Sequence, residues 1–330
     1  MSHVPFFSVV IPAYNCARWI GATLESFARQ TDRDFEVIVV DDGSTDDSAR
    51  IAESFADRID IRVLRERPSG APARPCNIGL AAARGELIVT CDSDDMATED
   101  RLAWMRRAWD QVDRQQCLIF SDFLEVDHEG TPVQRNKLST YSSVNRVLTV
   151  PVTEELSLLS AESAFDALVH GCFLRPCNVA APRSVFERVQ GFNEALRNGQ
   201  DYDIYLRIAE HFPFLWVRRE LALYRIVPGS ISTRSAIQMS PSRLAVLDRL
   251  LSLSLTPEQR RVVHETIAAN YEALGYAYGG RGELRRSLDA YLRAFRHKPA
   301  ISPVRGAAAS VAKAALRVSG LMREQTGSSR

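Results

Sequence analysis

Three carboxylates stand close together in the stretch CDSDD at residues 91–95, directly after the apolar run 87–90. Like charges at this spacing repel one another, so a nearby cation is needed to balance them. Two aspartates separated by one residue on an extended segment point to the same side, so Asp92 and Asp94 can reach one ion, while Asp95 is expected to point elsewhere and anchor the loop. Carboxylate oxygens suit Mg²⁺ or Mn²⁺, whose shell substrate phosphates commonly complete. The stretch therefore predicts a divalent-metal site for a phosphorylated ligand.

A solvated acidic turn before a helix would explain the same stretch. Residues 98–109 are predicted to be helical, and acidic side chains near a helix N-terminus are stabilised by the helix dipole. A second acidic pair, Asp41 and Asp42, ends the apolar run 35–41 and is equally compatible with a strand–helix turn. A carboxylate there can also accept a hydrogen bond from a nucleobase N–H. The acidic pairs alone leave both interpretations open.

The elements that must position these carboxylates alternate in type through the first 126 residues. Apolar runs of strand length alternate with segments whose apolar residues recur at helical spacing. Strands are predicted at residues 7–13, 35–41, 61–65, 86–90 and 117–126, and helices at 17–30, 46–55, 77–84 and 98–109. This alternation indicates an α/β fold with a mostly parallel sheet and helices on both faces. Ligands of such sheets bind at the carboxyl ends of the strands, where the acidic pairs stand.

The rest of the chain is less regular and then wholly helical. Residues 127–160 are polar and are predicted to form a long functional or mobile loop. Order is expected to return near residue 165. Strands follow at 178–182, 214–218 and 221–226, and helices at 184–189 and 201–211. From about residue 240 only helices are predicted.

The helical region offers two kinds of contact. Residues 269–299 resemble one tetratricopeptide-type hairpin, although a helical hairpin packed on the main domain explains the pattern as well, because repeat arrays need about three copies. The last predicted helix, 302–322, is basic and amphipathic, which suits an anionic membrane surface. Its small alanines favour packing against protein instead. Residues 324–330 are predicted to be a disordered tail.

The composition argues against some classes of function. The chain has 330 residues, of which 45% are hydrophobic, and its 41 Lys and Arg balance its 41 Asp and Glu. It therefore has no general attraction to nucleic acid. The six cysteines form no CxxC pair and no zinc-site spacing, which fits reduced thiols. The first residues do not suggest a signal peptide, and no apolar run approaches the roughly 20 residues of a membrane span, so we expect neither feature. We expect a cytoplasmic protein, which would lie at the inner face of the membrane if the last helix binds lipid.

Three motifs, in this order and spacing, resemble glycosyltransferase family 2, the nucleotide-diphospho-sugar transferases with the GT-A fold. They are SVVIPAYN at residues 8–15, VIVVDDGSTDDS at 37–48 and GELIVTCDSDD at 85–95. The resemblance covers roughly residues 7–232. It implies a GT-A domain at residues 1–235, with a nucleotide-sugar-binding half (1–126) and an acceptor half (127–235), followed by a helical region at 236–330.

The resemblance also implies roles for individual residues. Asp42, helped by Asp41, would bind the nucleobase in a pocket walled by residues 12–14. Asp92-Ser93-Asp94 matches the family's DxD, which touches the ribose and binds the diphosphate through Mn²⁺ or Mg²⁺. The metal ligands would be Asp94 and Asp92. The residues assigned to nucleotide-sugar binding are Pro12, Ala13, Tyr14, Asn15, Asp41, Asp42, Arg74, Asn77, Asp92, Ser93 and Asp94.

The stretch GQDYD at residues 199–203 resembles the family's EDxD, whose first aspartate is the catalytic base and maps onto Asp201. A helix N-cap is the simpler interpretation of Asp201, and the two roles are compatible. Inverting transfer needs one base for the acceptor hydroxyl and one Lewis acid for the leaving nucleoside diphosphate. His170, Gln200 and Tyr202 are assigned to the acceptor site.

Three positions depart from the family pattern. Pro75-Cys76-Asn77 stands where Ala-Arg-Asn is usual, with Arg74 as a possible source of the missing charge. Gln200 stands where Glu is frequent, and Val227 replaces a histidine. The departures at Gln200 and Val227 put fine details of acceptor binding or metal coordination in doubt.

The departures also keep one alternative open, a catalytically silent scaffold that binds a partner through its helical C-terminus. Two enzymatic alternatives fit less well. A Rossmann dehydrogenase would need G-x-G-x-x-G after the first strand, and a sugar nucleotidyltransferase would need a Gly-rich, basic loop there. We expect a metal-dependent, inverting glycosyltransferase that moves a sugar from a nucleotide-diphospho-sugar, most simply a UDP-sugar, to a saccharide, lipid-linked or protein-glycan acceptor.

Overall fold

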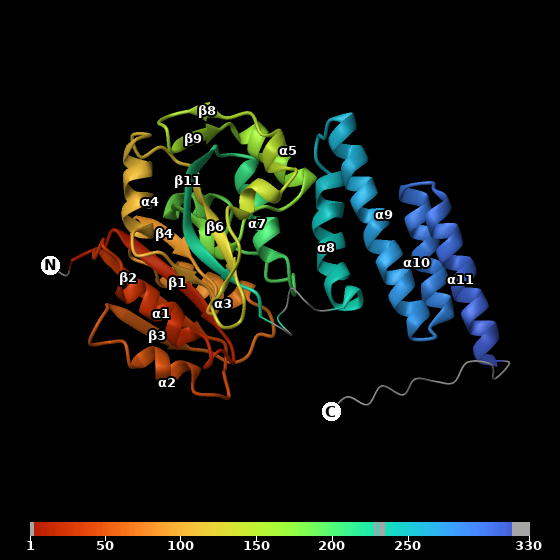
Figure 1. The fold of residues 1–330 in the computed structure, drawn as a ribbon, viewed down its shortest axis with the longest axis horizontal. Helices are drawn as coiled ribbons and strands as arrows, with labels where there is room; N and C mark the ends of the chain where they lie inside the picture. The colour runs from red at the N-terminus through yellow and green to blue at the C-terminus, as the bar shows by residue number, and fades with distance from the viewer. Residues whose placement is uncertain (1–2, 228–229, 231–234, 319–330) are drawn as a thin grey trace. The chain divides into compact units, whose positions relative to one another are not determined.

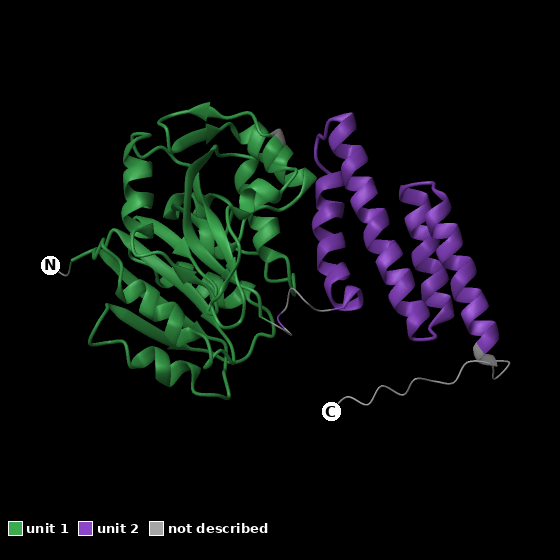
Figure 2. Ribbon diagram, viewed as in Figure 1, with its two compact units in different colours: residues 1–228 green, residues 229–330 purple. Residues whose placement is uncertain are grey.

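The computed structural model describes residues 3–227, 230 and 235–318. It divides into two compact units, residues 1–228 and 229–330 (Figure 2). The division falls slightly before the boundary between residues 235 and 236 that the sequence suggests. Among the described residues, no helix combines the length and the apolar character that crossing a membrane requires.

A single eleven-stranded sheet forms the centre of the first unit (Figure 1). Its strands follow the order β3-β2-β1-β4-β10-β6-β11-β9-β8, with β5 added to β11 and β7 added to β6. The strands are β1 (Phe7–Ala13), β2 (Phe35–Asp41), β3 (Ile61–Arg65), β4 (Leu87–Thr90), β5 (Met96–Ala97), β6 (Leu118–Val126), β7 (Pro132–Gln134), β8 (Val150–Pro151), β9 (Leu156–Leu159), β10 (Val179–Pro182) and β11 (Phe214–Arg225).

The sheet is parallel in one half and mixed in the other. Strand β1 pairs in parallel with both β2 and β4, and β2 pairs in parallel with β3. Strands β1, β2 and β4 are buried almost throughout, as their continuous apolar runs require. Strand β10 then runs antiparallel between β4 and β6, and β6 pairs in parallel with β11. The sequence predicts a mostly parallel sheet, and the parallel pairing is continuous in the half that carries the acidic motifs.

Helices connect and cover the strands of this unit. Helix α3 packs on β1 and β2, whereas α4 packs on β6 and β11. The helices are α1 (Ile20–Ala28), α2 (Ser48–Glu53), α3 (Ala73–Ala82), α4 (Arg101–Asp110), α5 (Ala161–His170), α6 (Arg183–Arg188) and α7 (Gln200–Ala209).

Two predictions about the second half of this unit are wrong. Residues 127–160 are not simply a loop, because β9 within them pairs with β11. The segment 214–226 is not two strands either. It forms the one strand β11, whose register against β6 shifts between Val217 and Ala222. The charged residues 218–220 lie at this irregularity, which explains why the apolar pattern breaks there while the strand continues.

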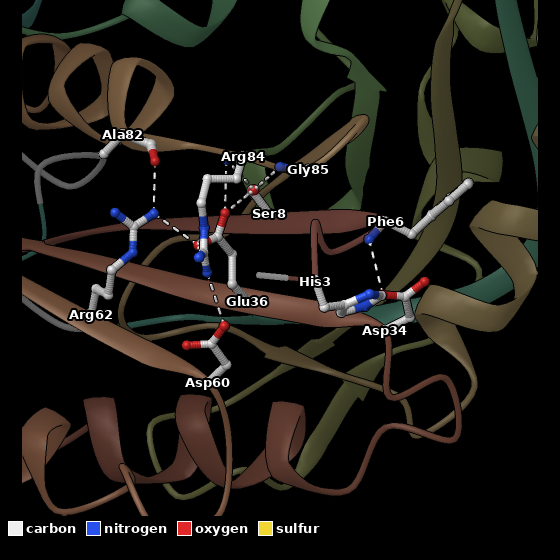
Figure 3. Close-up of polar contacts among 10 residues, drawn as sticks. All are labelled: His3, Phe6, Ser8, Asp34, Glu36, Asp60, Arg62, Ala82, Arg84 and Gly85. Carbon is white, nitrogen blue, oxygen red and sulfur yellow. Dashed lines mark hydrogen bonds and ion pairs between the residues drawn. The ribbon is translucent and has the colours of Figure 1, made fainter. Parts of the chain in front are cut away.

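The amino ends of the parallel strands are tied together by a buried carboxylate (Figure 3). Glu36, at the start of β2, is fully buried. It accepts hydrogen bonds from Ser8 Oγ at 2.6 Å, from Arg84 N at 2.8 Å and Nε at 2.9 Å, and from Arg62 Nη2 at 2.8 Å. These donors come from β1, from β3 and from the segment before β4. One carboxylate thus fixes the relative positions of four elements.

The described residues of the second unit form four helices in sequence, α8 (Ala236–Leu251), α9 (Pro257–Gly280), α10 (Leu284–His297) and α11 (Ile301–Val318). Each helix packs on the next, and α11 also packs on α9. The ring of Tyr291 fills a space that a side chain at Gly275 or Gly306 would occupy, since an added Cβ would come within 2.8 Å or 2.4 Å of the ring. The end of the predicted last helix, 319–322, and the predicted tail lie outside the described residues.

Candidate functional site

The acidic loop, residues 91–95, connects β4 to β5 at the carboxyl edge of the sheet. One carboxylate oxygen each from Asp92, Asp94 and Asp95 lies within 4.8 Å of the others. The expectation that Asp95 points elsewhere is wrong, because the loop turns back on itself, with Asp95 N donating to Asp92 O at 3.3 Å. Strand alternation does not apply to such a turn. Asp95 nevertheless anchors the loop as expected, since its Oδ1 accepts a hydrogen bond from Arg225 N at 2.8 Å.

Burial raises the pKa of all three carboxyls of the acidic loop. Repulsion from Asp94 raises the pKa of Asp92 and Asp95 further, and Asp201 adds to the effect on Asp92. Asp95 is fully buried, and its Oδ2 has no hydrogen-bond partner among the described residues. Buried carboxylates of this kind are costly unless a cation or further donors join them. The loop therefore has the charge, the oxygen donors and the unfilled bonding capacity of a divalent-metal site.

Two buried arginines contact this loop and its surroundings, and neither was among the predicted site residues. Arg225, at the end of β11, donates from Nε to Asp94 O at 2.9 Å. Arg101, at the start of α4, is fully buried and donates from Nη2 to Thr90 O at 3.2 Å and to Val179 O at 3.3 Å. Arg225 lies two residues before Val227, one of the positions that depart from the family pattern. A charged residue at the start of a helix, such as Arg101, carries no sequence signal of burial.

The predicted nucleobase residues gather at the ends of β1 and β2. Ala13 and Asp41 pair in the parallel register, and Asp42 N donates to Ala13 O at 2.8 Å. The Asp42 carboxylate accepts hydrogen bonds from Ser69 N at 2.9 Å and from Ser69 Oγ at 2.8 Å. Tyr14 is exposed over 57% of its surface, as a residue that stacks on a ligand could be. Sequence reasoning overlooked Ser69, whose neighbours in the chain gave no motif.

Asn15 supports the turn after β2. Its backbone lies in the left-handed region, with φ of 47°. Its Oδ1 accepts a hydrogen bond from Thr45 N at 2.8 Å, and its own N–H donates to Ser44 Oγ at 2.9 Å. Asn15 thus ties the end of β1 to the segment that follows Asp42, and its side chain shapes the edge of the predicted pocket.

A small cavity brings Asp92 together with Asp201. Helix α7 begins at Gln200, after Gly199 with φ of +67°, so Asp201 lies in the first turn and is not the N-cap. Gln200 Oε1 is buried and has no hydrogen-bond partner within the part of the chain that is described. The cavity is lined by Val10, Pro12, Cys76, Thr90, Cys91, Asp92, Pro176, Phe192, Gln200 and Asp201. Residues from distant parts of the sequence thus converge on one space.

Cys76 lines this cavity together with Asp92 and Asp201. Burial raises the pKa of its thiol well above the ordinary value, and the negative charges of Asp92 and Asp201 raise the pKa further. The thiol is therefore protonated at neutral pH, and it contributes neither a nucleophile nor a charge. The position at which the resembled family usually has Arg is a neutral wall of the cavity in this chain.

Arg74 and Asn77, both on α3, contact other parts of the protein. Asn77 Nδ2 donates to Phe192 O at 2.9 Å and to Glu194 Oε1 at 2.8 Å, and its Oδ1 accepts from Phe192 N at 2.8 Å. Its amide is therefore committed to the segment that leads into α7. Arg74 Nη2 lies 3.7 Å from Glu66 Oε2 and is about half exposed.

The three predicted acceptor residues are placed differently from one another. Gln200 lines the cavity, whereas His170 and Tyr202 are not among its lining residues. His170 Nδ1 lies 2.9 Å from Asp166 O, at the last turn of α5. Tyr202 Oη donates to Leu168 O at 2.9 Å and so links α7 to α5. Of the three, only Gln200 shares a cavity with Asp201.

The sequence model of one known family matches part of this chain. Residues 8–149 match the sequence model described as Glycosyl transferase family 2. Chondroitin synthase from Escherichia coli is 26% identical over 230 residues, which are 69% of this chain and 30% of that protein. The chain spans about a third of the length of such curated relatives.

Solved structures resemble the fold of nearly the whole chain. S. aureus TarS 1-349 in complex with UDP-GlcNAc gives a TM-score of 0.68 at 18% identity, over 95% of this chain and 92% of that one. The mannosyltransferase PcManGT from Pyrobaculum calidifontis, in complex with GDP-Man and Mn²⁺, gives a TM-score of 0.58 at 20% identity, over 96% and 81%. At these identities the likeness establishes the fold, which is the GT-A fold followed by helices.

Proposed function

We propose that this chain belongs to glycosyl transferase family 2, whose sequence model matches residues 8–149, and that the protein transfers a sugar from a nucleotide-diphospho-sugar to an acceptor hydroxyl, with inversion. The observation that carries this proposal is the cavity shared by Asp92 and Asp201. Asp92 belongs to the acidic loop, which suits a metal and a diphosphate. Asp201 lies in the first turn of α7, on the proposed acceptor side. The two requirements of inverting transfer, a base and a device for the leaving group, are therefore next to each other.

The nucleotide would lie along the carboxyl edge of the parallel strands. Its base would meet Asp42 and Tyr14 at the ends of β1 and β2, and its ribose and diphosphate would reach Asp92 and Asp94. This path follows the general rule that ligands bind beyond the carboxyl ends of the strands in such sheets. A UDP-sugar is the donor we propose.

A divalent ion fits the acidic loop, with Asp92 and Asp94 as its proposed ligands. Mn²⁺ and Mg²⁺ prefer such oxygen donors, and within the described part of the chain the Oδ2 of Asp95 has no hydrogen-bond donor. When bound, the ion would act as a Lewis acid that stabilises the negative charge of the leaving nucleoside diphosphate.

Asp201 is the proposed general base. Its carboxylate would accept the proton of the acceptor hydroxyl as that oxygen attacks the anomeric carbon. Gln200 Oε1, which is buried without a partner among the described residues, would accept a hydrogen bond from the acceptor or the donor sugar. Removing the hydroxyl proton at the attacking face makes a covalent glycosyl intermediate unnecessary, which is consistent with a protonated, inert thiol at Cys76.

The acceptor that we propose is a saccharide in polysaccharide or glycan synthesis. The support is indirect, since the E. coli relative is named a chondroitin synthase and this chain matches only a third of it. The acceptor half contains the elements that vary most in such folds, including the segment 127–160.

The first test is thermal-shift stabilisation of the full chain by nucleoside diphosphates, with and without Mn²⁺. A ligand that binds only the folded protein raises its melting temperature. We expect one nucleotide to stabilise the protein only when metal is present, and Asp94→Ala to abolish that shift. Transfer or donor hydrolysis is then measured with the sugar nucleotides of the same base. If no nucleotide raises the melting temperature under any metal condition, the proposal is wrong.

A catalytically silent scaffold is the alternative function. The replacement of two family positions by Cys76 and Val227 favours it, and so does the exposed apolar surface of α11, where Ile301 and Val304 are exposed over 66% and 56%. Binding of a nucleotide without transfer or hydrolysis of any sugar donor would support this alternative over the enzyme.

A further inference from the structure

Arg225 is nearly buried, with 6% of its surface exposed, and its contacts converge on the acidic loop. Its backbone N–H donates to Asp95 Oδ1 at 2.8 Å, and its Nε donates to Asp94 O at 2.9 Å. Its Nη2 lies 3.2 Å from Met96 Sδ. One residue thus contacts three consecutive positions, which include one proposed metal ligand and its neighbour.

The same side chain also contacts two segments outside the acidic loop. Arg225 Nη1 donates to His128 O at 3.1 Å, in the turn that follows β6. The guanidinium carbon lies 5.1 Å from the centre of the Trp19 ring, just before α1. Arg225 therefore joins the acidic loop, the turn after β6 and the segment before α1 through one rigid, planar group. Lysine could not reproduce these directions, because its ammonium is a point charge without the fork of N–H donors.

We propose that Arg225 is a positioning residue for the metal and the donor diphosphate. Its guanidinium, which bonds the carbonyls of Asp94 and His128, holds the acidic loop in its turned conformation before any ligand arrives, and its backbone N–H adds the bond to the Asp95 carboxylate. The loop would otherwise open, because three like charges lie within one turn. The proposal rests on the proposed function of this loop, and it adds that the loop is preorganised by an arginine that stands 131 positions after Asp94 in the chain.

The test compares the full-length protein with Arg225→Lys, and uses Arg183→Lys as a control. Arg183 Nη2 donates to Gly85 O at 2.8 Å at the opposite edge of the sheet, so its replacement also removes a guanidinium–carbonyl bond, away from the acidic loop. The first readout is amide hydrogen exchange of peptides that cover residues 91–97, measured without metal. We expect faster exchange in these peptides for Arg225→Lys, and unchanged exchange there for Arg183→Lys.

The second readout is the affinity for Mn²⁺ in the presence of a nucleoside diphosphate. Groups that orient metal ligands typically change metal affinity 10- to 100-fold, so we expect a loss of about that size for Arg225→Lys alone. Trp19→Leu keeps the guanidinium and removes the ring beside it, so a smaller loss of about threefold is expected. This variant remains informative if Arg225→Lys does not fold.

Each outcome decides a separate question. Unchanged exchange at 91–97 in Arg225→Lys, or equal losses of Mn²⁺ affinity in Arg225→Lys and Arg183→Lys, would overturn the positioning role while leaving the proposed function intact. If Arg225→Lys does not fold, unchanged exchange and affinity in Trp19→Leu would overturn it. If the wild-type protein binds neither Mn²⁺ nor any nucleotide, the proposed function is wrong, and so is the proposed role of Arg225 in donor binding.

Discussion

Both edges of the parallel half of the sheet contain buried carboxylates, but the two edges differ in how many hydrogen-bond donors surround them. At the amino edge, Glu36 is surrounded by donors from Ser8, Arg62 and Arg84 (Figure 3). At the carboxyl edge, Asp92, Asp94 and Asp95 crowd together, and the Oδ2 of Asp95 has no partner within the described part of the chain. The protein itself supplies the hydrogen-bond donors of Glu36, whereas the acidic loop needs a cation or further donors from a ligand.

The pKa values express the same contrast. Burial alone would raise the pKa of the Glu36 carboxyl, but hydrogen bonds from Ser8, Arg84 and Arg62 outweigh burial and hold the pKa below its usual range. Burial and mutual repulsion raise the pKa of Asp92 to about 8, with only Arg175 in opposition. A buried carboxylate therefore indicates a ligand site when its donors are missing, and a structural role when they are all present.

Asp201→Asn should have the largest effect, and it tests the carboxyl edge alone. The amide cannot take the acceptor proton, so we expect the transfer rate to fall by about 100- to 10 000-fold while donor affinity stays the same. The measurement is kcat for transfer, with binding of the nucleotide measured separately. Asp110→Asn on α4, an exposed carboxylate paired with Arg114, is the control. A fall of less than tenfold would remove Asp201 from the role of base.

Asp94→Ala should weaken binding of Mn²⁺ with a nucleoside diphosphate at least about 100-fold, because a direct ligand matters at least as much as the groups that orient it. The ligand-free melting temperature should stay the same or rise, since one repelling charge is removed. Titration calorimetry and thermal unfolding check the two expectations. Asp47→Ala, at an exposed carboxylate paired with Arg50, should change neither. A large loss of ligand-free stability in Asp94→Ala would show that the acidic loop is structural.

Glu36→Ala should lower the stability of the protein and leave its affinity for ligands unchanged. It leaves Ser8, Arg62 and Arg84 without their shared acceptor, and we expect a loss of about 3 kcal/mol in the free energy of unfolding. Denaturant unfolding measures this loss. The affinity for Mn²⁺ with nucleotide should remain unchanged in the folded fraction. A change in that affinity of tenfold or more would mean that the two edges are not independent.

The two edges should also give stability opposite dependences on pH. The pKa of Glu36 is lowered in the folded state, so its contribution is present above the unfolded value and is lost as pH falls through the folded value. The pKa of Asp92 is raised to about 8, so its contribution is present at low pH and is lost as pH rises toward that value.

In metal-free protein, Asp92→Asn should therefore remove a decline in stability between about pH 4 and pH 8, of several kcal/mol, because each unit of pKa shift is worth about 1.4 kcal/mol. Glu36→Gln should flatten the acid side of the same profile. Unfolding measured across this pH range distinguishes the two. An unchanged profile in Asp92→Asn would contradict the charge crowding described for the acidic loop.

The parallel half of the sheet could be predicted from the sequence because its signals are local. Strands β1, β2 and β4 are continuous apolar runs, and the predicted bounds of each lie within one residue of those observed. The convergence of the acidic motifs followed from a general property of parallel strands, that their carboxyl ends meet at one edge. The resemblance to a known family then directed attention to Asp201, whose own surroundings carry no local sign of a base.

The parts of the site that could not be predicted depend on contacts between residues that are distant in the chain. Nothing near Arg225 in the chain indicates that it bonds to Asp94 and Asp95, because the two segments meet only through the pairing of β11 with β5 and β6. Asn77 illustrates the converse, since its motif suggested a ligand contact while its amide is occupied by Phe192 and Glu194. Hydrogen-bond partners decide such roles, and these partners are set by topology.

The bond between Asp42 and Ser69 has a thermodynamic consequence for donor selection. Both carboxylate oxygens of Asp42 already accept hydrogen bonds from Ser69. On the proposed assignment, a nucleobase N–H would bind an acceptor site that Ser69 leaves open, because the two oxygens of a carboxylate offer about four such sites. Ser69 fixes the direction of the carboxylate in advance, and this favours every base that presents an N–H in the same way. Discrimination between donors must then come from contacts that differ among bases, so the shape of the pocket around Pro12 and Tyr14, more than the charge of Asp42, would decide which nucleotide the protein prefers.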